Sequence, residues 1–79
     1  MTLGGAFNLL KLNVAADQLD AVLGVLPAMA SPTVMTLVAK DMRALETVVP
    51  KKGVNTLIPA LKSAGARDIL ELPISKIVE

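Results

Sequence analysis

The sequence contains no cysteine, histidine, tryptophan or tyrosine, and its only aromatic residue is Phe7. Without cysteine, the chain can form neither a disulfide framework nor a thiol nucleophile, which is compatible with a cytoplasmic location. Histidine and cysteine are also common metal ligands, and no carboxylates stand at metal-ligand spacing. We therefore expect this chain to bind no metal or cofactor and to have no catalytic centre of its own.

Charge is scarce as well, because only 19% of the residues are charged and the net charge is +1. The eight basic residues are scattered and not interleaved with aromatic residues, so nucleic-acid binding has no support. Asp17 and Asp20 fit solvated acids of an early helical turn, where carboxylates suit the helix dipole, better than a metal pair. Gly4, Gly5 and Gly65 match no phosphate-binding loop.

Residues 21–39 contain no charge, and this length is close to the roughly 20 residues of a membrane-spanning helix. Pro27 and Pro32 interrupt the segment, and its pattern changes from helical to strand-like midway. The N-terminus also lacks a basic region followed by an apolar core. We therefore expect core packing rather than a membrane span, and no signal peptide.

Aliphatic side chains are what the sequence has in excess, since 53% of its residues are hydrophobic and almost none are aromatic. A chain of 79 residues buries only about 60% of its unfolded surface. The apolar excess then favours a spare apolar face that pairs with another copy or domain. We expect an oligomer, either a trimer or a hexamer.

Four segments have the pattern of β-strands, in which apolar or β-branched residues alternate with others. They cover residues 7–14, 33–37, 42–49 and 69–72. In the first segment Leu10, Leu12 and Val14 share the face that we expect to be buried. A short polar turn at Lys40 and Asp41 joins the second and third segments, which favours an antiparallel hairpin.

Two segments have the pattern of amphipathic helices, with apolar residues at i, i+3, i+4 and i+7. The first helix precedes Pro27, which ends it, and Asn13 is placed to cap its first turn. The second begins near Val54, and Gly65 is placed for its C-terminal cap. Pro59 falls inside this pattern, which predicts either a helix start near residue 55 or a bend near the proline.

The order β-α-β-β-α-β predicts a ferredoxin-like α+β sandwich, in which a four-stranded antiparallel sheet carries two helices on one face. Residues 1–6 are expected to be a flexible lead-in, and residues 7–79 a single domain. The other sheet face would be open, with aliphatic side chains such as Leu9, Leu45 and Val49. This open face is the surface at which we expect self-association.

Three runs of residues carry a resemblance to a known family. They are L-P-A-M-A-S-P-T-V at residues 26–34, T-V-V-P at 47–50, and L-K-S-A-G-A-R-D-I-L-E-L-P-I-S-K-I at 61–77. Present in this order and at this spacing, they resemble the C-terminal regulatory domain of long-form ATP phosphoribosyltransferase. The resemblance extends from about residue 9 to residue 78, nearly the whole chain.

The resemblance implies a specific function. That family catalyses the first step of histidine biosynthesis, which joins ATP to phosphoribosyl pyrophosphate. Its regulatory domain is ferredoxin-like, resembles the nitrogen-regulatory PII proteins, and binds L-histidine at subunit contacts to inhibit the enzyme. The two catalytic domains, with their phosphoribosyl-binding loop and any Mg²⁺, have no counterpart here. The implied role is an allosteric module for feedback inhibition that works with those catalytic domains.

Carried over position by position, the histidine pocket of the family corresponds to Asn13, Met29, Thr33, Val48 and Asp68. The asparagine can accept a hydrogen bond from an α-ammonium group, and the threonine hydroxyl can donate to an α-carboxylate. Met29 and Val48 can flank an imidazole ring. Structural roles stay open beside these, with Asn13 as a helix cap, Thr33 as a strand starter and Met29 as core filler.

Two functional hypotheses remain. The first is the histidine-sensing module of ATP phosphoribosyltransferase, either as an excised domain or as a free-standing relative. The second is a free-standing PII-like interaction domain that forms oligomers and binds another small ligand or none. Titration with L-histidine separates them.

Overall fold

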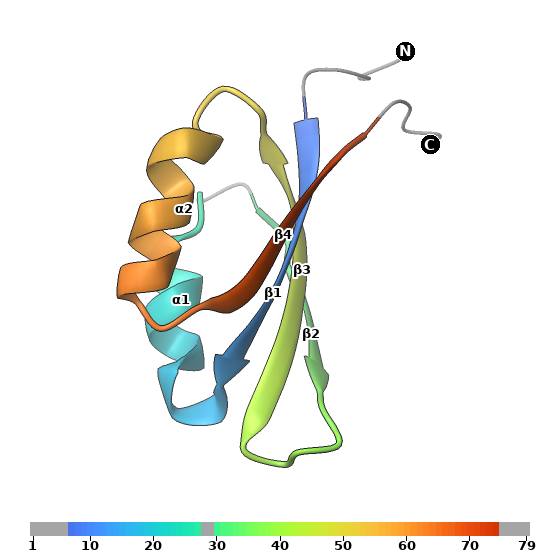
Figure 1. Cartoon of the computed structure of the whole chain (residues 1–79), viewed down its shortest axis with the longest axis vertical. Helices are drawn as coiled ribbons and strands as arrows, with labels where there is room; N and C mark the ends of the chain where they lie inside the picture. The colour runs from blue at the N-terminus through green and yellow to red at the C-terminus, as the bar shows by residue number, and fades with distance from the viewer. Residues whose placement is uncertain (1–6, 28–29, 75–79) are drawn as a thin grey trace.

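The computed structural model describes residues 7–27 and 30–74, which form a four-stranded antiparallel sheet with two helices against one face (Figure 1). The strands are β1 (Phe7–Ala15), β2 (Thr33–Thr36), β3 (Met42–Pro50) and β4 (Arg67–Pro73). The helices are α1 (Leu19–Val25), preceded by the 3₁₀ turn Ala16–Gln18, and α2 (Val54–Ser63). The strand order is β2-β3-β1-β4. This order, with every pairing antiparallel, confirms the predicted ferredoxin-like fold.

The core lies between the sheet and the helices and is aliphatic, as the composition requires. The predicted buried face of β1 is confirmed, because Leu10, Leu12 and Val14 are all fully buried. Asn8 is buried on the same face, and its amide donates a hydrogen bond to the carboxylate of Glu71 on β4. This partner satisfies the one polar side chain that β1 buries here.

The prediction that Leu45 and Val49 lie on the open face is wrong. Leu45 pairs with Leu12, and Val49 pairs with Asn8, so both share the face that the helices cover. Their exposed fractions are 0% and 1%. Leu9 does lie on the open face, because it pairs with Val48. Alternation within β3 separates two faces but does not say which one meets the helices; only the pairing register with β1 decides that.

The first helix is shorter than its apolar pattern, and the predicted cap by Asn13 is wrong. Asn13 lies inside β1, and neither the 3₁₀ turn nor α1 has a side-chain hydrogen bond at its N-cap. The other end is as predicted: Leu26, directly before Pro27, leaves the helical region with ψ 149°. Neither helix in the described part of the chain is long and apolar enough to cross a membrane.

Pro59 lies inside helix α2 and not in its first turn. The helix begins at Val54, one residue from the expected start, and Pro59 is its sixth residue. A proline at this position has no N–H for the carbonyl of Asn55, four residues earlier. Both side chains are exposed, so the α2 surface that carries this missing bond faces water.

Gly65 ends α2 as the sequence predicts. Its φ of 113° lies in the region that favours glycine, and its N–H bonds the carbonyl of Lys62 at 3.1 Å. The N–H of Ala66 bonds the carbonyl of Leu61 at 2.9 Å, which completes a Schellman motif. Leu61 and Ala66 are both buried in the core, so the cap also directs the chain from α2 into β4.

We expect Gly65→Ala to lower the free energy of unfolding by about 1–2 kcal/mol, because a Cβ atom disfavours the left-handed region. The new Cβ would also stand 2.6 Å from the side-chain oxygen of Gln18, but that flexible side chain can move away. Urea unfolding measures the loss. The double variant Gln18→Ala/Gly65→Ala should keep most of it; full recovery would show that the contact, and not the backbone, sets the cost.

Candidate functional site

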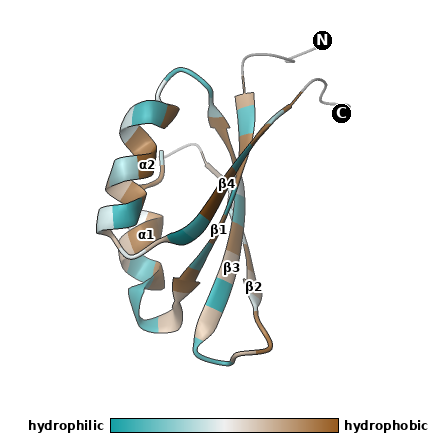
Figure 2. Ribbon diagram, in the orientation of Figure 1, coloured by the Kyte–Doolittle hydropathy of each residue, from teal (hydrophilic) through white to brown (hydrophobic). Residues whose placement is uncertain are grey.

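The sheet face opposite the helices exposes several large aliphatic side chains. Leu9 on β1 pairs with Val48 on β3 and with Leu72 on β4, which puts these three side chains in one row across the sheet. Val48, Leu70 and Leu72 are 43–55% exposed. Figure 2 shows that apolar segments of β4, in brown, are separated by hydrophilic ones, in teal. We call this surface, with Met35 of β2, the open face.

An ion pair lies in the middle of the open face. Lys11 pairs with Glu46 across β1 and β3, and Nζ stands 3.7 Å from Oε1. Both side chains are partly exposed, so in the single chain this pair adds little stability. Aliphatic side chains surround this ion pair. A surface that covers the open face must therefore offer complementary charged or polar groups at this position.

Asn13 and Asp68 come together at one end of the sheet. The Nδ2 of Asn13 donates to Oδ2 of Asp68 at 3.2 Å. The register between β1 and β4 shifts here, because Lys11 pairs with Leu70 whereas Asn13 pairs with Arg67. Strand β4 therefore has one residue more than β1 in this interval, and Asp68 has φ 52°. Aspartate tolerates this conformation better than most residues, and such bulges often re-aim a side chain.

Thr33 and Val48 lie elsewhere on the same face. Thr33 opens β2 and pairs with Glu46, so its hydroxyl is exposed on the side of the Lys11–Glu46 pair. Val48 lies on β3, two residues after Glu46, the residue that pairs with Thr33. Two strand spacings and two residues separate Thr33 from Asn13, which puts their Cα atoms roughly 12 Å apart. The structure thus places the four described site residues on one surface but in two separate groups, Asn13 with Asp68 and Thr33 with Val48.

The fifth predicted site residue, Met29, lies outside the described residues. Of the remaining four, Asn13 and Asp68 are in direct contact, and Thr33 and Val48 lie on neighbouring strands. These positions were expected only from the family resemblance, which did not include the contact between Asn13 and Asp68. The bulge that creates it has no clear sequence signal, because Arg67 and Asp68 stand where a strand was not expected to begin.

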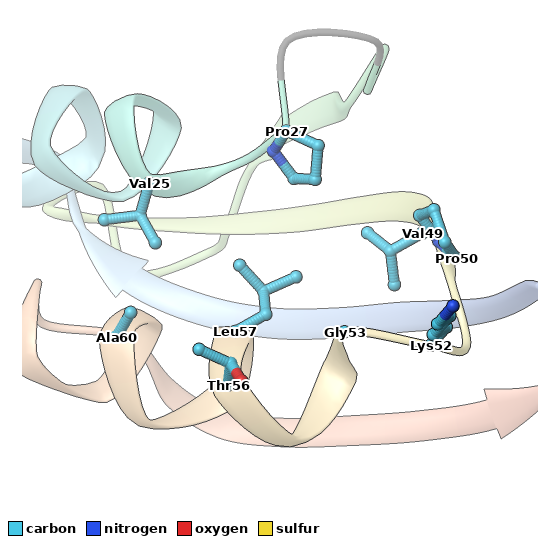
Figure 3. A pocket seen from close by; sticks show the side chains of 9 residues that line it. All are labelled: Val25, Pro27, Val49, Pro50, Lys52, Gly53, Thr56, Leu57 and Ala60. Atoms are coloured by element: carbon cyan, nitrogen blue, oxygen red, sulfur yellow. The ribbon is translucent and has the colours of Figure 1, made fainter.

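A pocket of about 340 Å³ lies on the other side of the sheet, and none of the four described site residues lines it (Figure 3). It opens between the end of α1 and the first turns of α2. Its lining is mostly apolar and includes Val25, Pro27, Val49, Pro50, Lys52, Gly53, Thr56, Leu57 and Ala60. The sequence pattern does not predict these lining residues; its one related signal is Pro27, which ends the first helix early and lines the pocket.

Comparison with known proteins shows to which family this chain belongs. Residues 6–76 match the family described as the HisG, C-terminal domain. The chain belongs to this family. The match spans both helices and all four strands, so the Asn13–Asp68 contact and the open face both lie within the HisG C-terminal domain.

Several ATP phosphoribosyltransferases contain a closely similar segment. The enzyme of Desulforudis audaxviator is 54% identical over 87% of this chain, and that of Pelotomaculum thermopropionicum is 49% identical over 87%. The enzyme of Solibacter usitatus is 45% identical over 99% of this chain. The chain spans only 24–29% of the length of these relatives. The similarity therefore identifies a HisG C-terminal domain and does not extend to the rest of these enzymes.

The fold also resembles a solved structure of the Arabidopsis thaliana PII protein bound to citrate. The TM-score is 0.66, and the alignment covers 94% of this chain and 82% of the PII chain. Sequence identity is 17%, so this likeness shows the fold alone. It confirms that this HisG C-terminal domain has a PII-like fold.

Proposed function

We propose that this chain is the regulatory module of an ATP phosphoribosyltransferase and that it binds L-histidine between copies of the domain. The observation that carries the proposal is the preformed Asn13–Asp68 contact on the same face as Thr33 and Val48. Family membership supports the association with catalytic domains, which would carry the phosphoribosyl chemistry and any Mg²⁺.

The Asn13–Asp68 pair suits the α-ammonium group of an amino acid. Because the Asn13 amide nitrogen donates to Asp68, its carbonyl oxygen is left to accept from a ligand. The carboxylate of Asp68 adds a second acceptor and a negative charge. Hydrogen bonds to charged groups are the stronger ones in proteins, so this pair can fix the cationic end of the ligand.

Thr33 and Val48 suit the rest of the ligand. The exposed hydroxyl of Thr33 can donate to the α-carboxylate, and the Val48 side chain offers an apolar surface to an imidazole ring. Met29 would flank the other side of the ring, as the resemblance implies.

The separation of the two groups favours a site shared between copies. The ammonium and carboxylate of one amino acid are bonded to the same carbon, so they cannot easily reach both Asn13 and Thr33 across roughly 12 Å of one sheet. A flat face also leaves a ligand in water, whereas ligand sites bury most of the ligand surface. A second copy over the open face supplies both the missing contacts and the cover.

Calorimetric titration of the chain with L-histidine tests this function. We expect saturable binding of L-histidine and weaker binding of histidinol, which keeps the ring and the ammonium but lacks the carboxylate. Self-association without binding of L-histidine would instead favour a free-standing PII-like interaction domain.

We expect the purified chain to form a trimer or a hexamer at micromolar concentration. The physical reason is the row of Leu9, Val48 and Leu72, whose burial is favourable at about 25 cal/mol per Å² of apolar surface. Multi-angle light scattering measures the mass directly. If the measured mass stays that of one chain at every concentration up to about 0.1 mM, self-association is contradicted.

We also expect no phosphoribosyl-ATP formation by this chain alone. Phosphoryl and pyrophosphate groups are usually held by glycine-rich loops and by Mg²⁺ on carboxylates, and the sequence has no such loop. An assay with ATP, phosphoribosyl pyrophosphate and Mg²⁺ checks this. Turnover that copurifies with the 79-residue chain and is unaffected by further purification would overturn the expectation.

A further inference from the structure

The pocket between α1 and α2 has the size and the lining of a small-molecule site. Its volume of about 340 Å³ falls at the lower end of the range of ligand pockets, about 300–1,000 Å³. Val25 and Pro27 form one wall, Leu57 and Ala60 the opposite wall, and Val49 lies between them (Figure 3). These are aliphatic groups, so the pocket suits an aliphatic ligand body rather than a polar one.

The pocket follows from the unequal lengths of the helices. Helix α1 ends at Val25 because Pro27 follows, whereas α2 begins at Val54 and runs for 10 residues. Among the described residues, α1 reaches this part of α2 only with its last residue, Val25, which lines the pocket together with Leu57 and Ala60. Two small residues widen the space, since Ala60 has only a Cβ and Gly53 has no side chain at all.

The charge around the pocket has one sign. Lys52 lines its end next to Pro50 and Gly53, and Thr56 adds a hydroxyl (Figure 3). Among the described residues that line the pocket, none is acidic. The first turn of α2 also carries no acidic side chain and has no side-chain cap, so its positive dipole end is not compensated there. An anionic group is therefore the favoured polar end of a ligand.

We propose that this pocket binds a small aliphatic carboxylate, with its hydrocarbon body between Val25 and Leu57 and its carboxylate at Lys52. This site is distinct from the open face, because the sheet separates the two and they share no residue. It does not depend on histidine binding. An apolar pocket with a single cation at its end selects against zwitterionic amino acids, whose ammonium group would be desolvated without a partner.

Titration of the ¹⁵N-labelled chain with octanoate tests the site, with the amides of Val25, Gly53 and Leu57 as reporters. We expect a dissociation constant below about 1 mM and weaker binding of 1-octanol, which lacks the charge. Butyrate should bind at least about 50-fold more weakly, because each buried CH₂ contributes about a factor of four.

Three variants locate the two ends of the ligand. Ala60→Leu fills the pocket and should weaken octanoate binding at least about tenfold, because the probe loses room for its methylene groups. Lys52→Met should weaken it about two- to fivefold, as expected for an exposed ion pair. Lys51→Met is the matched control, because Lys51 is exposed and does not line the pocket, and it should bind like the wild type.

Equal affinity in all three variants, with melting temperatures near that of the wild type, would overturn the proposal. So would the absence of octanoate-induced shifts at the three reporter amides. L-Histidine binding, if present, should be the same in Ala60→Leu and in the wild type, so failure of this site leaves the proposed function untouched and the reverse also holds.

Discussion

Val49→Asp should prevent folding, whereas the same substitution one residue earlier, Val48→Asp, should leave the domain folded. Val49 is 1% exposed and belongs to the core, so an aspartate there would bury a charge without a partner. A domain of 79 residues has a total stability of about 4–12 kcal/mol, which such a charge can exceed. Val48 is 43% exposed on the open face, where a carboxylate stays in water as long as the chain is alone.

These two variants also test self-association, because Val48 lies on the open face that we expect a second copy to cover. Circular dichroism should show an unfolded Val49→Asp chain and a folded Val48→Asp chain. Light scattering should then show that Val48→Asp is monomeric, because assembly would bury its charge among Leu9 and Leu72. A folded Val49→Asp chain would contradict the assignment of the two faces, and a Val48→Asp chain that assembles like the wild type would contradict self-association through the open face.

Thr33→Val should weaken L-histidine binding about ten- to a hundredfold. Removal of a hydrogen-bond partner from a buried charged group costs about 1.5–3 kcal/mol, and each 1.4 kcal/mol is a factor of ten in affinity. Valine keeps the β-branched shape that an edge strand such as β2 prefers, so the fold should be retained. Calorimetric titration, with a melting curve for each variant, measures both effects.

Thr36→Val is the matched control for Thr33→Val. Thr36 lies on the same strand and is also exposed, but it pairs with Arg43 and therefore points to the other side of the sheet. It should bind L-histidine like the wild type. Equal affinity of Thr33→Val and the wild type would remove Thr33 from the site, and equal losses in both variants would point to a general effect on β2.

The fold could be predicted because its signals are local. Period-two runs gave the strands, recurring apolar residues gave the helices, and Pro27 and Gly65 marked the two helix ends. Alternation could not show which face of β3 meets the helices. The prediction for Leu45 and Val49 is wrong because the face that they occupy depends on their pairing with β1, which is a long-range contact.

The candidate site was less predictable for a similar reason. Asn13 has the chemistry of a helix cap, and only the tertiary structure shows that its amide bonds Asp68, 55 residues away. That contact depends on the register shift between β1 and β4, which no sequence pattern predicts. The pocket at Val25 and Leu57 likewise results from how two helices of unequal length stand side by side.

A chemical-shift map of L-histidine on the ¹⁵N-labelled chain is the most direct test of the proposed function. We expect saturable shifts at the amides of Asn13, Thr33, Val48 and Asp68, with the amides of the pocket between α1 and α2 unchanged. Shifts confined to that pocket, or no shifts at all at millimolar L-histidine while the chain is folded and assembled, would contradict histidine sensing by this domain.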